Sequence, residues 1–189
     1  MITKYLYPNI KKADVIPILE CAIAGALIAG LYGIVHDQIT FTISPEYFTK
    51  LKFKQFHYAD FGLGDRVFVA TIGFLATWWV GLFLGWFFGR RFIPNQTRND
   101  AVKNIRNGFL IVFASGVVFA VGGYLYAFVV KPTTALYGWS SLLNALDVID
   151  GIAFVHVIHI HYASYAGALF GLICTFIFVR PNTKLNDVM

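Results

Sequence analysis

The stretch from 67 to 89 reads VFVATIGFLATWWVGLFLGWFFG, and it decides the fold class. Its 23 residues carry no charge and are followed directly by Arg90 and Arg91. A helix needs about 20 apolar residues, at 1.5 Å rise each, to cross the hydrocarbon core of a bilayer. The stretch therefore predicts a membrane-spanning helix that ends at a basic pair.

Three other apolar runs extend this prediction to the whole chain. Of its 189 residues, 58% are hydrophobic and only 13% are charged. Soluble domains carry about 25% charged residues, so this chain has too little polar surface to cover a globule in water. We expect an all-α fold, an integral membrane four-helix bundle forming a single domain over 1–189. The predicted spans are about 15–36, 67–89, 109–130 and 155–179.

The distribution of basic residues predicts the orientation of the bundle. Ten of the 15 Lys and Arg residues lie in the N-terminal segment, the linker 90–106 and the C-terminal tail, and five lie in the other two loops. The positive-inside rule places both termini in the cytoplasm, in a bacterial inner membrane. The net charge of +5 flanks apolar segments, which indicates lipid headgroups and not nucleic acid as the partner.

Small residues recur at intervals of four on three of the spans. The second span has Gly81, Gly85 and Gly89, and stripes of the same kind occupy 25–33 on the first span and 163–171 on the fourth. Lipid supplies no hydrophobic drive for helix association, so close backbone approach through small residues takes that role. These stripes predict the contacts within the bundle. The sequence also leaves open a homo-oligomer or a membrane-complex partner.

The two loops on the predicted outer side carry signs of order. Ser44-Pro45-Glu46 is typical of a helix start or of a turn between two strands. The stretch 50–54 alternates lysine with apolar residues, which favours a strand or an interfacial ribbon. We expect an ordered extracytoplasmic loop between the first two helices, and a short interfacial helix within 140–150.

All five histidines fall on the extracytoplasmic side of this topology, and most of the acidic residues share that bias. His36 and Asp37 close the first span, Glu46 can fold over from the loop, and His161 lies in the outer part of the fourth span. Imidazole with carboxylate is the ligand mix of zinc, non-haem iron or manganese. These four residues are the predicted metal ligands, with His156 and His159 as the alternative to His161.

Other residues are candidates for supporting roles. Tyr165 or His159 is the expected acid/base or orienting group. Glu20 lies about two turns inside the first span, where an ionisable side chain costs about 2.5–3.5 kcal/mol on insertion scales and is a functional candidate by default. It could equally hydrogen-bond a neighbouring helix or extend to the headgroups. His57, in the long loop, is expected to be a solvated polar residue.

Several segments resemble a family of uncharacterised bacterial membrane proteins of about this length. The segments are HDQIT at 36–40, SPEYFT at 44–49, ATWWVG at 76–81, and His161 with Ser164-Tyr165. The resemblance covers most of the chain and implies the same four-span fold. It implies no activity.

Three hypotheses for function follow from these patterns. The leading one is a metal-binding membrane protein, acting as a hydrolytic or oxidative enzyme on a lipid or another apolar substrate. The second is a b-type haem electron carrier with paired histidines on the first and fourth helices. The third is a non-enzymatic subunit or small transporter. The chain lacks a Walker loop, HExxH, GxSxG and a dinucleotide fingerprint, so no familiar motif selects an activity.

Overall fold

The computed structural model describes residues 10–129 and 138–181, and it contains four helices long and apolar enough to cross a membrane. They are α2 (Lys12–Ile43), α4 (Asp65–Phe92), α5 (Arg98–Val129) and α8 (Gly151–Phe178). The described residues include no strand. The all-α class and the four apolar spans are confirmed, and the helices extend beyond most of the predicted limits.

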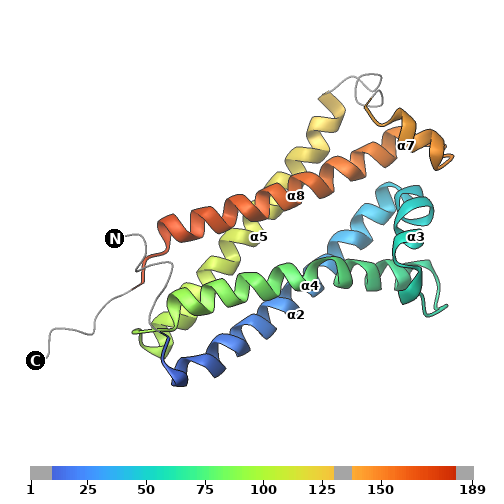
Figure 1. Ribbon diagram of the computed structural model, residues 1–189. Coiled ribbons are helices and arrows are strands. Elements are labelled where there is room, and N and C mark those ends of the chain that lie inside the picture. Colours follow the sequence, from blue (N-terminus) through green and yellow to red (C-terminus); the bar gives the residue numbers. More distant parts are fainter. Residues whose placement is uncertain (1–9, 130–137, 182–189) are drawn as a thin grey trace, which may run out of the picture.

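The four long helices form two pairs, α2 with α4 and α5 with α8 (Figure 1). Within the first pair a Cβ on Gly25 would meet the backbone of Gly81, and a Cβ on Gly33 would meet that of Gly73. The Thr77 hydroxyl donates to the Ala29 carbonyl of the facing helix at 2.8 Å. The predicted small-residue stripes therefore set how closely these two backbones approach.

The second pair, α5 with α8, also packs closely through small residues. A Cβ on Gly167 would meet Ser115 and Phe119, and one on Gly171 would meet the Val112 backbone. The close packing thus lies within each pair, and the space between the two pairs is filled by larger side chains and by the cavity described below.

The segments 44–64 and 138–150 lie together at one end of the bundle and are named the cap here (Figure 1). The cap contains a π-helix (Tyr47–Lys52), the short helix α3 (Phe53–Gln55), a 3₁₀ turn (His57–Ala59) and the helix α7 (Ser140–Ala145). The other end, the base, holds the start of α2, the connection from α4 to α5 and the end of α8 (Figure 1).

The strand or ribbon favoured for 50–54 is wrong, and of the two alternatives for Ser44-Pro45-Glu46 the helix start is correct. The Ser44 hydroxyl accepts the Tyr47 N–H at 3.4 Å, and helix begins at Pro45. Tyr47, Phe48 and Leu51 have helical spacing and pack on the first turns of α8 in one apolar cluster. Burial of these residues outweighs the two-residue alternation of the lysines.

The helix predicted within 140–150 is confirmed as α7, and its N-cap residue is Trp139. A second apolar cluster, built on Phe88, Phe92 and Phe109, fills the half of the bundle nearer the base. The bundle thus has one dense apolar core near the cap and another near the base. The candidate site lies between them.

Candidate metal centre

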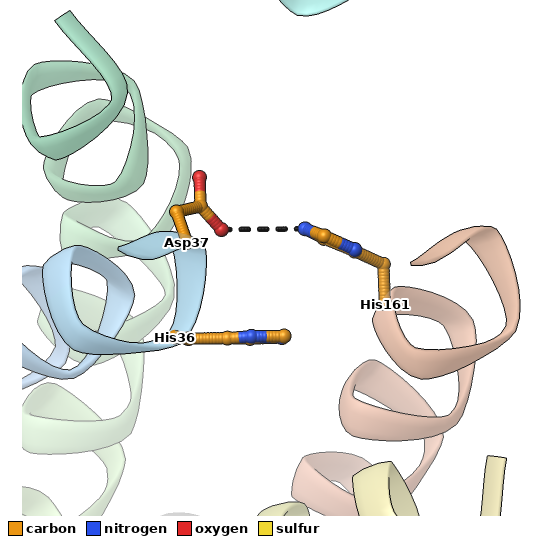
Figure 2. A group of neighbouring side chains, drawn as sticks. All are labelled: His36, Asp37 and His161. Carbon is orange, nitrogen blue, oxygen red and sulfur yellow. Dashed lines mark hydrogen bonds and ion pairs between the residues drawn. The ribbon is translucent and has the colours of Figure 1, made fainter. Parts of the chain in front are cut away.

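The candidate site is a group of three side chains, His36, Asp37 and His161, that come from α2 and α8 (Figure 2). Each offers one ligand atom, and these atoms all lie within 4.8 Å of one another. Asp37 and His161 are buried, at 5% and 8% exposure, and His36 is half-buried. In the described part of the chain the structure thus brings together three of the four predicted ligands.

The site lies inside the bundle and not at the ends of its helices. The first span was expected to close at His36, whereas α2 continues to Ile43. Asp37 is six residues, or about 9 Å, from the end of this helix. The last turns of α2 pack Phe41 into the core, and carbonyls one turn back satisfy the Thr40 and Thr42 hydroxyls.

Hydrogen bonds fix the orientation of the His161 ring. Its Nδ1 lies 2.9 Å from the Val157 carbonyl, which can only accept, so Nδ1 carries the proton of this bond. The opposite nitrogen, Nε2, lies 3.2 Å from Oδ1 of Asp37. A neutral imidazole protonated at Nδ1 presents a lone pair to that carboxylate. The two atoms attract each other only with a cation between them, either a proton or a metal ion.

Aromatic contacts hold the two histidines in place. The His36 and His161 rings stack at 4.7 Å between centroids, with an interplanar angle of 26°. Tyr47 of the cap contacts the His161 ring at 5.0 Å, and Tyr32 meets His36 edge-on at 5.7 Å. Neither ring nitrogen of His36 has a hydrogen-bond partner among the described residues, so both are available to a ligand.

A cavity of about 70 Å³ adjoins the three residues and separates the two helix pairs. Its wall toward the base is mostly apolar, including Ile72, Val80 and Phe109. Its polar lining includes Tyr32 and Ser164, whose hydroxyls lie 3.1 Å apart, and Tyr165. A polar reaction centre here would therefore open onto an apolar binding space.

Sequence reasoning did not select Lys52, although it lines the same cavity. Lys52 is half-buried at the end of the π-helix, with Nζ 5.7 Å from the centre of the Tyr47 ring. Burial lowers the pKa of this ammonium group, and the negative charge of Asp37 opposes that shift. π-Helical turns are frequent at functional sites, but a π-helix is not visible in a single sequence.

Glu46, the fourth predicted ligand, is engaged elsewhere. Its carboxylate accepts the Asp150 N–H at 2.7 Å and the Ile149 N–H at 3.1 Å, and it pairs with Lys50 at 3.0 Å. Lys50 in turn donates to the Asp147 carbonyl. Glu46 and Lys50 therefore form a clasp that joins the two segments of the cap.

The clasp predicts a loss of stability in acid. The Asp150 N–H, then the Ile149 N–H and Lys50, lower the pKa of Glu46 below its ordinary value of 4.5. The stabilisation is therefore complete above about pH 4.5 and disappears as the pH falls through the lowered pKa. Thermal unfolding in detergent should show Glu46→Gln less stable than wild type at pH 7. The difference should shrink below pH 4.5, and a constant difference would contradict the clasp.

The remaining candidates lie apart from the three-residue group. Nδ1 of His159 bonds the Val155 carbonyl at 2.9 Å, and its ring contacts Tyr126 of α5. His156 is buried against Tyr124 and Phe128. Glu20 is exposed on α2 and not packed between helices, and His57 is exposed in the cap. Of the two predicted acid/base residues, Tyr165 lines the cavity and His159 does not.

Comparison of the chain with protein-family models, with curated proteins and with solved structures found no match.

Proposed function

We propose that this chain is a multi-pass membrane protein that binds a divalent transition metal at His36, Asp37 and His161. The proposal places the cap on the extracytoplasmic side of a bacterial inner membrane. The bound metal serves an enzymatic reaction on a lipid or another apolar substrate. One observation carries the proposal: Nε2 of His161 and a carboxylate oxygen of Asp37 face each other at 3.2 Å inside an apolar bundle.

The surroundings of His161 match those of a metal-ligating histidine. Such histidines usually donate their second N–H to a backbone carbonyl or a carboxylate, which fixes the tautomer and the ring orientation. The bond from Nδ1 to the Val157 carbonyl does this in α8. Ligands around tetrahedral zinc, each about 2.0–2.2 Å from the metal, lie about 3.3–3.5 Å from one another. The Nε2 to Oδ1 distance of 3.2 Å is close to that spacing.

The ligand set suits a reactive rather than a structural centre. Structural zinc sites are closed by four protein ligands, whereas catalytic sites use three and keep a position open. Two histidines and one carboxylate are also the ligands of non-haem iron oxygenases. Zinc, iron and manganese are therefore the candidate metals.

The cavity supplies the other parts that a reaction needs. A divalent metal can polarise a substrate carbonyl or lower the pKa of a bound water to about 7. Tyr165 lies one helical turn beyond His161 and lines the same cavity, so it can donate or accept a proton there. The apolar wall toward the base would exclude bulk water from the reacting groups.

The geometry favours a metal ion over haem. Two axial histidines must point their nitrogens at one iron from opposite sides of a porphyrin plane. The His36 and His161 rings instead stack at 4.7 Å, too close for a porphyrin between them. An electron carrier with these two residues as paired axial ligands would need a different arrangement of α2 and α8.

Metal analysis of the wild-type protein tests the proposal. Protein purified without a nickel column should contain near-stoichiometric zinc, iron or manganese by mass spectrometry. Imidazoles ligate only when unprotonated, so the metal should be released progressively as the pH is lowered. Metal-free wild type that also fails to bind added zinc, iron or manganese would show that the His161–Asp37 pair is bridged by a proton. The subunit or transporter hypothesis would then take first place.

A further inference from the structure

We infer that the site takes a single-chain lipid with an anionic head group, which reaches it from the bilayer through a groove between α2 and α5. The inference names the substrate class of the proposed metal centre and so rests on the proposed function. It is carried by the shape of the groove, its junction with the cavity and the charges around that junction.

The groove has a volume of about 550 Å³. Its apolar lining comes from α2, α5 and one residue of α8: Val35, Ile39, Ile43, Val117, Ala120, Val121 and Ile160. Small-molecule pockets typically hold about 300–1,000 Å³. The groove volume suits one hydrocarbon chain better than a two-chain phospholipid.

The groove faces the surface that a bilayer would cover. Val35 and Ile39 are each 59% exposed, and Val121 is 52% exposed. Close small-residue packing lies within the pairs α2–α4 and α5–α8, so no such contact closes the seam between α2 and α5. A chain in the hydrocarbon core can therefore enter the groove sideways without crossing water.

The groove and the internal cavity share Tyr32 and His36 in their linings. His36 is half-buried at this junction, and it is also one of the three candidate ligands. A lipid lying along the groove would thus bring its polar end to the metal centre, where Tyr32 and Ser164 offer hydroxyl groups 3.1 Å apart.

The charges at the junction favour an anionic head group. Asp37 is the one carboxylate lining the cavity within the described residues, and Lys52 adds a half-buried ammonium group. With a divalent metal bound, the positive charges outnumber the negative charge of Asp37. A carboxylate or phosphate on the lipid would offset this excess, whereas a cationic head group would increase it.

Photolabelling with a long-chain fatty acid tests the inference. The probe carries a diazirine in its chain and is added to wild-type protein in lipid nanodiscs. Labelled peptides should map to 32–43 of α2 and 117–124 of α5. An unlabelled fatty acid should compete about tenfold or more better than the alcohol of equal length, the ratio expected for one charge-assisted hydrogen bond. Label spread evenly over all lipid-facing helices, or equal competition by acid and alcohol, would overturn the inference.

Two pairs of variants distinguish a specific effect on lipid binding in the groove from a general disruption of the fold. Ala120→Trp fills the groove and should abolish the α2 and α5 label, whereas Val118→Trp, on an exposed part of α5 outside the groove lining, should retain it. Lys52→Met should reduce the preference for acid over alcohol, since the charge of the metal remains, and Lys52→Arg should keep the preference in full. Unchanged preference in Lys52→Met would overturn the charge argument even if Ala120→Trp failed to fold.

Metal content, measured on the same samples, keeps the two proposals distinct. The groove and Lys52 variants should hold as much metal as wild type. A wild type with metal and no localised label refutes only the lipid inference, whereas a wild type without metal refutes the proposed function.

Discussion

His161→Ala should reduce the bound metal from near one ion per chain to background while the protein stays folded. Of the two proposed ligand histidines, His161 is the one whose ring direction is fixed by a hydrogen bond within the described residues, and its loss leaves two proposed donors on adjacent residues of α2. Loss of an outer-shell partner costs about 10–100-fold in metal affinity, and loss of a ligand should cost more. Elemental analysis after size-exclusion chromatography measures the effect.

His159→Ala is a matched control on the same helix. Both histidines bond the carbonyl one turn back at 2.9 Å, but the His159 ring contacts Tyr126 and lies outside the three-residue group. His159→Ala should therefore keep its metal, and so should His57→Ala in the cap. Equal loss in His161→Ala and His159→Ala would indicate general damage to α8, and full retention in both would exclude His161 as a ligand.

Gly85→Leu should destabilise the bundle by about 3 kcal/mol or more, at the upper end of the usual cost of overpacking. A Cβ at this position would lie 2.8 Å from the Ala22 Cα and against the Cys21 carbonyl, both in the backbone of α2. A rigid backbone cannot yield as a flexible side chain can, so α4 would have to move away from α2. Thermal unfolding in detergent should show a large drop in stability.

Gly122→Leu provides the matched control for this substitution. A Cβ on Gly122 would meet no atom within 4 Å, so a leucine there would extend into lipid or detergent. Replacing glycine within a helix also raises helix propensity, which favours stability slightly. Gly122→Leu should thus be neutral or mildly stabilising. Equal destabilisation by both substitutions would show that close packing of α2 with α4 is not what Gly85 provides.

The three residues of the candidate site could be selected from the sequence because they share one depth in the bundle. The positions of His36, Asp37 and His161 along their helices follow from the apolar runs and the 1.5 Å rise per residue. Glu46 lies in the cap instead, beyond the depth of the site, and accepts backbone N–H groups at the start of α8. The position of a loop carboxylate in the sequence fixes neither its depth nor its direction, so its partner could not be foreseen.

The place of Lys52 in the cavity lining could not be predicted from the sequence either. The lysines at 50, 52 and 54 look equivalent in the sequence, yet Lys50 joins the clasp and Lys52 lines the cavity. Their roles separate only because Tyr47, Phe48 and Leu51 pack on α8 and fix the rotation of this segment. Contacts between residues about 100 positions apart in the sequence therefore determine which lysine lines the cavity.

The sequence by itself determined the four spans and the small-residue faces of the helices. Both depend on properties that can be read along one segment. Bilayer thickness fixes the length of each apolar run, and the size of each side chain limits how closely two helix backbones approach. The tertiary structure decided the pairing of α2 with α4 and of α5 with α8. It also decided the rotation that turns His161 toward Asp37 and the groove that ends at His36. These features depend on how four separate helices pack together, and hydropathy and spacing along one chain do not specify that.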